Sequence, residues 1–212
     1  MRERSTEVPT RSEPHTATTL AECLRLMKND IGEAIAADEL LYVIEHHVNS
    51  WDDPPEKLEP GLQFMVDALA LRMALAINRL FQPAGQDRTN FSQLKNLVAT
   101  NTAVDPNIEN AFTKAATLAA SDNLVRLKPC RDGFMAHTLV GSLGNRHGMQ
   151  SSTISDALQN AEELFEELHS ALTGSTAGLT EVRTRWRQRA AEFWQDRLPQ
   201  SAPTRGNVGK ED

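Results

Sequence analysis

Hydrophobic residues recur every three or four positions through much of the chain, which is the spacing that places them on one face of an α-helix. The first series begins after Thr16, where Thr18 or Thr19 is available to cap a helix. A second series follows directly, and it either continues this helix or forms a new one. The first series is Leu20, Leu24, Met27, Ile31 and Ile35, and the second is Leu40, Leu41, Ile44 and Val48.

The most regular apolar stripe lies between Gly61 and about Phe81. The stretch before it, residues 51–56, contains consecutive prolines that cannot continue a helix, so it is expected to be a connection. The stripe consists of Leu62, Met65, Val66, Leu69, Met73, Ala76, Ile77 and Leu80. We expect this helix to lie in the core, with alanines on its other faces that let neighbouring helices approach.

Further amphipathic helices are predicted along the rest of the chain from caps and apolar spacing. These are a short helix beginning at Asn90 or Ser92 and running through Val98, a helix opened by Asp105-Pro106 that leads towards Pro129, one that follows the cap candidates Ser151–Asp156 and runs through Leu172, and a last one from about Thr180 to Arg197. Glycine-rich or polar breaks separate them at 83–88, 141–148 and 174–178.

The predicted fold class is all-α, a bundle of about five or six helices, because no convincing alternating strand pattern occurs. With 212 residues the chain is long enough for one domain with a sizeable core. We expect a single helical domain over residues 16–198. Residues 1–15 are proline-containing and nearly free of apolar side chains, so they are expected to form a disordered tail, and residues 199–212 a flexible one.

The composition favours a cytoplasmic protein with no membrane association. The two cysteines, Cys23 and Cys130, form neither a disulfide framework nor a zinc pattern. No uninterrupted apolar run approaches the roughly 20 residues that cross a bilayer, and the N-terminus lacks the apolar stretch of a signal peptide.

The chain is acidic overall, but its charge is unevenly distributed. A formal net charge of −7 argues against a general nucleic-acid coat protein, since non-specific binding relies on many cations. Between Leu124 and His147, however, four cations stand against one carboxylate, a local excess of +3. This stretch is compatible with a small RNA footprint or a nucleotide.

Candidate chemistry concentrates in residues 128–137, where an arginine, an acid and a histidine lie close together in sequence. Arg131 can hold a phosphate with a fork of donors, and His137 can move protons near neutral pH. Six residue steps leave the two side chains roughly 120° apart on a straight helix. Either Gly133 starts or loosens the helix between them, or they meet partners from a second copy of the chain. The alternative is a surface arginine at a helix start and a histidine in the core.

The order Arg131-Asp132 followed by Ala136-His137 resembles the signature of the HEPN superfamily (higher eukaryotes and prokaryotes nucleotide-binding domains). The stretch 67–81, followed by a short polar break and 91–97, looks like the abortive-infection (AbiU-type) branch of that superfamily. The likeness covers roughly residues 20–175. Gly133 stands where that branch often has lysine, so this chain has one positive charge fewer there.

The resemblance implies an all-α fold and a metal-independent endoribonuclease, without a cofactor, that acts as a toxin or phage-defence effector. Arg131 would hold the phosphoryl oxygens, His137 would act as general acid or base, and Asp132 would orient one of them. The resemblance also implies a homodimer with a composite site, an RNA substrate and, in some relatives, an antitoxin protein as partner. The alternative is a non-catalytic member of the fold that binds a nucleotide or RNA or serves as a scaffold.

Other polar residues are assigned to binding or to the surface. Candidates to contact RNA or a nucleotide are Lys128, Arg126, Arg146, His147, Arg72 and Arg79. Arg72 and Arg79 lie seven residues apart on one helix face, where they either line a cleft or are solvated or salt-bridged. The glutamates at 162, 163, 166 and 167 are expected to form a solvated face. The final helix is expected to dock its tryptophans and expose its arginines, with stacking on nucleic acid as the alternative.

Overall fold

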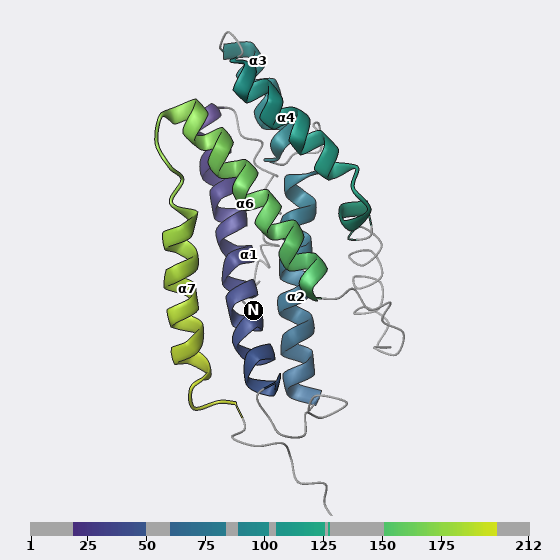
Figure 1. Cartoon of the computed structure of the whole chain (residues 1–212), viewed down its shortest axis with the longest axis vertical. Coiled ribbons are helices and arrows are strands. Elements are labelled where there is room, and N and C mark those ends of the chain that lie inside the picture. The colour runs from purple at the N-terminus through teal and green to yellow at the C-terminus, as the bar shows by residue number, and fades with distance from the viewer. Residues whose placement is uncertain are drawn as a thin grey trace, which may run out of the picture.

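The computed structural model describes residues 19–49, 60–83, 89–101, 105–125, 127 and 151–198, and the regular secondary structure in these ranges is helical. The elements are α1 (Leu20–Asn49), α2 (Pro60–Leu80), α3 (Phe91–Asn101), α4 (Pro106–Ala119), α6 (Ser151–Thr173) and α7 (Leu179–Trp194) (Figure 1). The predicted all-α class is therefore confirmed for the described residues.

Helix α1 is one continuous helix of 30 residues, so the second apolar series continues the first. The side-chain oxygen of Thr19 accepts a hydrogen bond from the backbone N–H of Glu22 at 3.2 Å, which is the predicted cap. The starts of α3 and α4 follow the same rule. The Asn90 carboxamide oxygen accepts from the Gln93 N–H at 2.8 Å ahead of α3, and a carboxylate oxygen of Asp105 accepts from the Asn107 N–H at 2.8 Å at the start of α4.

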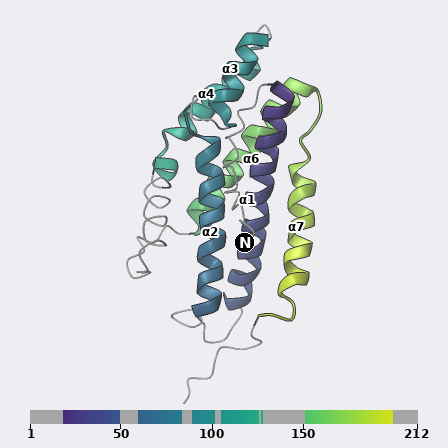
Figure 2. The same ribbon diagram turned by 180° about the vertical axis from the view of Figure 1, so that it is seen from behind.

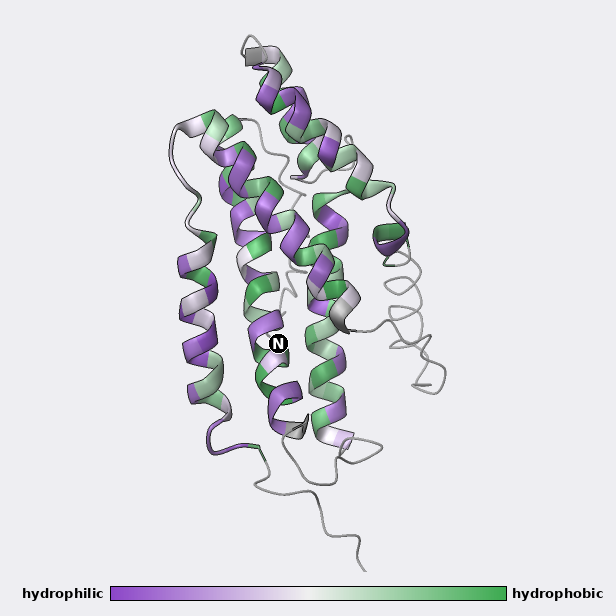
Figure 3. Ribbon diagram, viewed as in Figure 1, coloured by the Kyte–Doolittle hydropathy of each residue, from purple (hydrophilic) through white to green (hydrophobic). Residues whose placement is uncertain are grey.

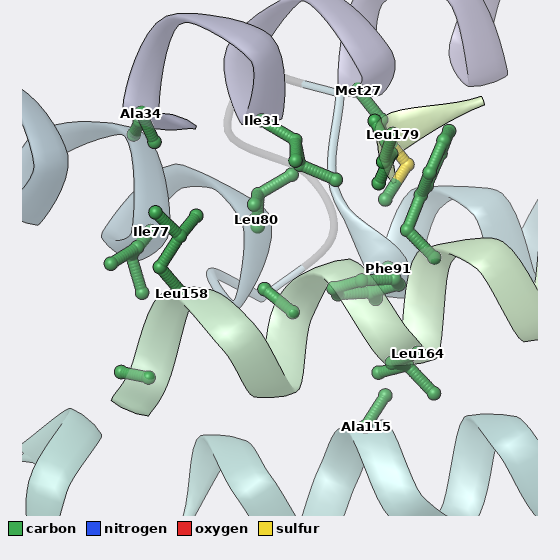
Figure 4. Packing of buried hydrophobic residues seen from close by; sticks show 14 of the residues in the cluster. Met27, Ile31, Ala34, Ile77, Leu80, Phe91, Ala115, Leu158, Leu164 and Leu179 are labelled. Atoms are coloured by element: carbon green, nitrogen blue, oxygen red, sulfur yellow. The ribbon is translucent and has the colours of Figure 1, made fainter. Parts of the chain in front are cut away.

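The core lies where α1, α2 and α6 meet. Helices α1 and α2 run side by side, α6 crosses both, and α7 packs along the opposite side of α1 (Figures 1 and 2). Ile31 from α1, Ile77 from α2 and Leu158 from α6 are fully buried and converge there (Figure 4). Helices α3 and α4 pack at one end of this group, with α4 against α6. The apolar faces of these helices thus pack against one another and form one hydrophobic core.

The helix that begins at Asp105-Pro106 ends earlier than its apolar pattern suggested. It stops at Ala119, where the backbone N–H of Ser121 bonds the Leu118 carbonyl in a tightened turn, and residues 122–125 form a further helical turn. Leu124 and Leu127, which were expected to extend the helix, are nevertheless buried in the core. The chain bends so that both leucines can reach the core.

The last two helices are joined by residues 174–178, as predicted. Gly174 and Gly178 adopt positive φ angles of 71° and 73°, a region that glycine enters without steric cost. Helix α7 begins at Leu179, one residue before the predicted start, and ends at Trp194 rather than Arg197. The buried residues of α7, Leu179, Ala190 and Trp194, are few, so the apolar contribution to its docking is modest.

Helix α2 is apolar on more than one side, and hydrophobic colour predominates along its ribbon (Figure 3). By length and composition it is the one helix in the described ranges that could cross a membrane, although only 22% of its apolar window is buried inside the structure. The averaged window in α2 includes Asp67 and Arg72, whereas the sequence expectation concerned apolar runs. The absence of membrane association and the cytoplasmic location therefore stay predictions.

Candidate functional site

The predicted catalytic residues lie outside the described residues. This applies to Arg131, Asp132 and His137, and equally to Lys128, Arg126, Arg146 and His147. The structure does describe the chain on either side of them. Leu127 is 0% exposed before the segment, and Ile154 is buried soon after it in α6. The described residues on both sides of the segment that carries the motif are therefore part of the hydrophobic core.

Arg72 and Arg79 both form ion pairs with α1. Arg72 Nη2 lies 2.5 Å from a carboxylate oxygen of Glu33, and Arg79 Nη2 lies 3.1 Å from Asp30 Oδ1. Helices α1 and α2 run in opposite directions, so Arg79, which follows Arg72 in α2, pairs with Asp30, which precedes Glu33 in α1. These pairs account for the seven-residue spacing and correspond to the salt-bridged alternative. A role for either arginine in RNA binding stays a prediction.

The most heavily charged cluster in the described residues joins α1, α6 and α7, and we call it the α7 clamp. It consists of Asp38, Glu39, Glu162, Arg183 and Arg187. Arg183 Nη1 lies 2.7 Å from Asp38 Oδ2 and 2.7 Å from Glu39 Oε1, and its Nη2 bonds Glu162. Arg187 Nε donates to the second oxygen of Glu39 at 2.8 Å. One guanidinium thus holds three helices together.

Burial affects the charges and the pKa values of the clamp residues. Glu39 is 1% exposed and Arg183 is 25% exposed, so their charges are largely removed from water. Burial raises the pKa of Glu162, with Arg183 acting against that shift and Asp38 and Glu39 adding to it. Burial acts to lower the pKa of Arg183, but hydrogen bonds to Glu162 and Asp38 outweigh it and raise that pKa. Glu162 therefore resists ionisation mainly because it is buried, and the neighbouring carboxylates of Asp38 and Glu39 add to this effect.

The clamp overturns two expectations about charged faces. Glu162 is half-buried in the clamp, and Glu166 accepts hydrogen bonds from the backbone N–H groups of Ala177 and Leu179, each at 2.7 Å. Glu166 therefore caps α7 in place of Gly178, which has no side chain to do so. Of the four glutamates that were expected to form a solvated face, only Glu163 and Glu167 are exposed. Arg183 is likewise a half-buried anchor and not a fully exposed arginine.

The docking interpretation of the final helix fits the aromatic side chains. Trp194 is buried in a small cluster with Ile44 of α1. Trp186 packs partly against the main core, and the Arg189 guanidinium lies 5.4 Å from the centre of its ring. The sequence signal for the clamp was the four-residue spacing of Arg183 and Arg187, which places them on one helix face. That spacing alone does not reveal acids that lie about 145 residues earlier.

No family model, curated protein or solved structure matches this chain. The likeness to HEPN proteins therefore rests on the motif and helix order of the chain itself. Within the described ranges, no group of three or more histidine, cysteine, aspartate or glutamate side chains is arranged to hold a metal ion. The clamp is suited to fixing α7 and not to binding a substrate, because its carboxylates are already bound to arginines.

Proposed function

We propose that this protein is a HEPN-like endoribonuclease that cleaves RNA without a metal ion and acts as a toxin or phage-defence effector. The observation that carries the proposal is the order of Arg131, Asp132 and His137 in a locally basic stretch of an acidic chain. The all-helical architecture is compatible with it. Core anchors on both sides of the segment also support it, because a catalytic segment must be held in place by rigid elements.

RNA suits such a minimal site because it carries its own nucleophile. The 2′-hydroxyl attacks the adjacent phosphorus, the bond to the 5′-oxygen breaks, and a 2′,3′-cyclic phosphate and a 5′-hydroxyl remain. The protein needs only to orient the phosphate, stabilise its developing charge and move protons. In the proposed arrangement Arg131 binds the phosphoryl oxygens, His137 transfers the proton, and Asp132 orients one of the two.

The proposed site is composite, with Arg131 of one copy beside His137 of a second copy across a two-fold axis. This arrangement follows from the angular separation of the two positions on a helix and from the family resemblance. A mixed dimer of Arg131→Ala with His137→Ala, purified through two different tags, retains one intact pair. It should cleave RNA well above either mutant homodimer, whereas silence from a folded mixed dimer would rule out simple complementation in trans.

The direct test incubates purified protein with RNA in the presence of a chelator. Cleavage should persist and leave 2′,3′-cyclic phosphate ends. His137→Ala should abolish it, while His46→Ala, which changes an exposed histidine on α1, should not. A requirement for added divalent metal, or equal activity of His137→Ala and the parent protein, would refute the proposal.

The alternative is a non-catalytic protein of the same fold that binds a nucleotide or RNA or serves as a scaffold. It is favoured by the net charge of −7 and by Gly133, which leaves one cation fewer beside the motif. Expression of an RNA-cleaving toxin should arrest cell growth, and His137→Ala should relieve the arrest. Harmless expression combined with tight RNA or nucleotide binding, lost in Arg131→Ala, would support the alternative.

A further inference from the structure

Helix α7 makes few apolar contacts with the bundle. It lies along the outside of α1, and no described helix covers its far side (Figures 1 and 2). Its buried side chains are Leu179, Ala190 and Trp194. The indole N–H of Trp194 is buried without a hydrogen-bond acceptor among the described residues, so part of the gain from burying this ring is lost. Segments with few buried apolar contacts are the first to open in a folded protein.

The charges of the α7 clamp are divided between α7 and the rest of the bundle. Both cations, Arg183 and Arg187, belong to α7, whereas the three carboxylates belong to α1 and α6. When α7 leaves the bundle, all of these groups return to water and recover the solvation that burial removed. Releasing the whole clamp therefore costs less free energy than its short ion pairs suggest.

The start of α7 is attached in a different way from the rest of the helix. Ala177 and Leu179 are buried in the main core, and their N–H groups both bond Glu166. Beyond the first turn, Trp194 belongs to a separate small cluster. We call residues 183–198 the latch. A detached helix of this length is marginal in water, so the latch leaves the bundle and unwinds in a single event.

Asp38 connects the latch with the start of α6. Its Oδ2 accepts a hydrogen bond from Arg183 at 2.7 Å, and its Oδ1 accepts one from the Ser155 hydroxyl at 2.6 Å. Ser155 lies near the beginning of α6, the helix that follows the segment with Arg131 and His137. One carboxylate thus contacts both the latch and the helix start that comes after the candidate motif.

We propose that the latch is a conformational switch, which opens as one unit while α1, α2 and α6 stay folded, and that Asp38 links its state to the start of α6. In the closed state Arg183 holds the Asp38 carboxylate, and this carboxylate holds Ser155. In the open state the carboxylate has lost its cation and turns to water, so the start of α6 loses a contact. Salt favours the open state because it screens the attraction between the latch and the bundle.

The first experiment measures native-state amide hydrogen exchange of the full chain by NMR. The amides of residues 187–194 should share one opening free energy, lower than that of the core amides of Ile31 and Ile77. Raising NaCl from about 0.1 M to about 1 M should increase the opening constant of the latch about tenfold and change that of the core less than about twofold. Latch exchange that ignores salt, or that has the same opening free energy as the core, would overturn the proposal.

The second experiment compares two arginines of the same helix. Arg183→Ala should increase the opening constant of the latch by about tenfold or more, because it leaves buried carboxylates without their cation. Arg185→Ala removes an exposed arginine that takes no part in the clamp and should change the constant less than about twofold. Equal effects of the two variants would show that the clamp does not control the latch. The salt response of the parent protein decides the proposal even if Arg183→Ala does not fold.

The third experiment tests the link through Asp38. Arg183→Ala should also speed exchange at the amides of residues 155–158, and this effect should disappear in a Ser155→Ala background, where the hydrogen bond to Asp38 is already lost. Amides of α3, which packs against α1 and α4, are the control and should not change. Unaltered exchange at residues 155–158, or an effect that persists in Ser155→Ala, would refute the link. None of these readouts depends on ribonuclease activity, so the switch and the proposed function can fail separately.

Discussion

Arg183 Nη1 of α7 lies 2.7 Å from Glu39 Oε1 of α1, although 144 residues separate them in sequence. Glu39 is nearly inaccessible to water, so its charge depends on this partner and on Arg187. Helix α7 buries few apolar side chains, and the clamp therefore contributes a large share of what holds it to the bundle.

Replacing Arg183 by alanine should destabilise the protein by about 3 kcal/mol, because it leaves buried carboxylates without their main cation. The change is measured as the free energy of unfolding in urea. Lys114→Ala, which removes an exposed pair with Glu167, is the matched control and should cost about 0–1 kcal/mol. Equal losses from the two variants would show that the clamp is no stronger than a surface ion pair.

Glu162 should make stability depend on pH in the direction opposite to an ordinary ion-paired carboxylate. Its pKa is raised above the usual 4.5 by burial, with Asp38 and Glu39 reinforcing and Arg183 opposing the shift. Above 4.5 the native state therefore binds more protons than the unfolded chain, so this contribution to stability is fully present at lower pH and is lost as pH rises.

The measurement compares the parent protein with Glu162→Gln by urea unfolding at a series of pH values. The stability of the parent relative to the variant should fall as pH rises above 4.5. Glu163→Gln, which changes the exposed neighbour, should show no such trend. If the parent protein instead gained stability relative to Glu162→Gln as pH rises, the raised pKa of Glu162 would be contradicted.

Glu166→Ala should loosen the start of α7, because the N–H groups of Ala177 and Leu179 both lose their acceptor. We expect a loss of about 1–3 kcal/mol of stability and faster hydrogen exchange at those two amides. Glu166→Gln retains one acceptor oxygen and should lose less. Unchanged exchange at both amides in Glu166→Ala would show that Glu166 does not cap this helix.

Cys23 should be inert in the native protein. Burial and the neighbouring Glu22 raise the pKa of its thiol to about 12, and the thiolate is the reactive form. In a Cys130→Ser background, labelling by a disulfide reagent near pH 8 should therefore proceed only as fast as the protein unfolds. Labelling that is rapid without denaturant and independent of stability would contradict the buried position of Cys23.

The helix boundaries were largely predictable because their causes are local. Thr19, Asn90 and Asp105 each bond a backbone N–H two or three residues onward, and such caps act within a few residues of the chain. The end of α4 was not predictable in this way. Its apolar pattern continues to Leu127, and only the position of the core shows that the chain must bend to bury Leu124 and Leu127.

The sequence by itself determined the all-α class, the order of the helices and the motif on which the ribonuclease proposal rests. The tertiary structure alone decided which charges meet, as in the pairing of Arg183 with Glu39 and Glu162, and which face of α2 is covered. The reason is physical. Caps and periodicity are properties of neighbouring residues, whereas burial and ion pairing depend on the side chains that distant helices bring together.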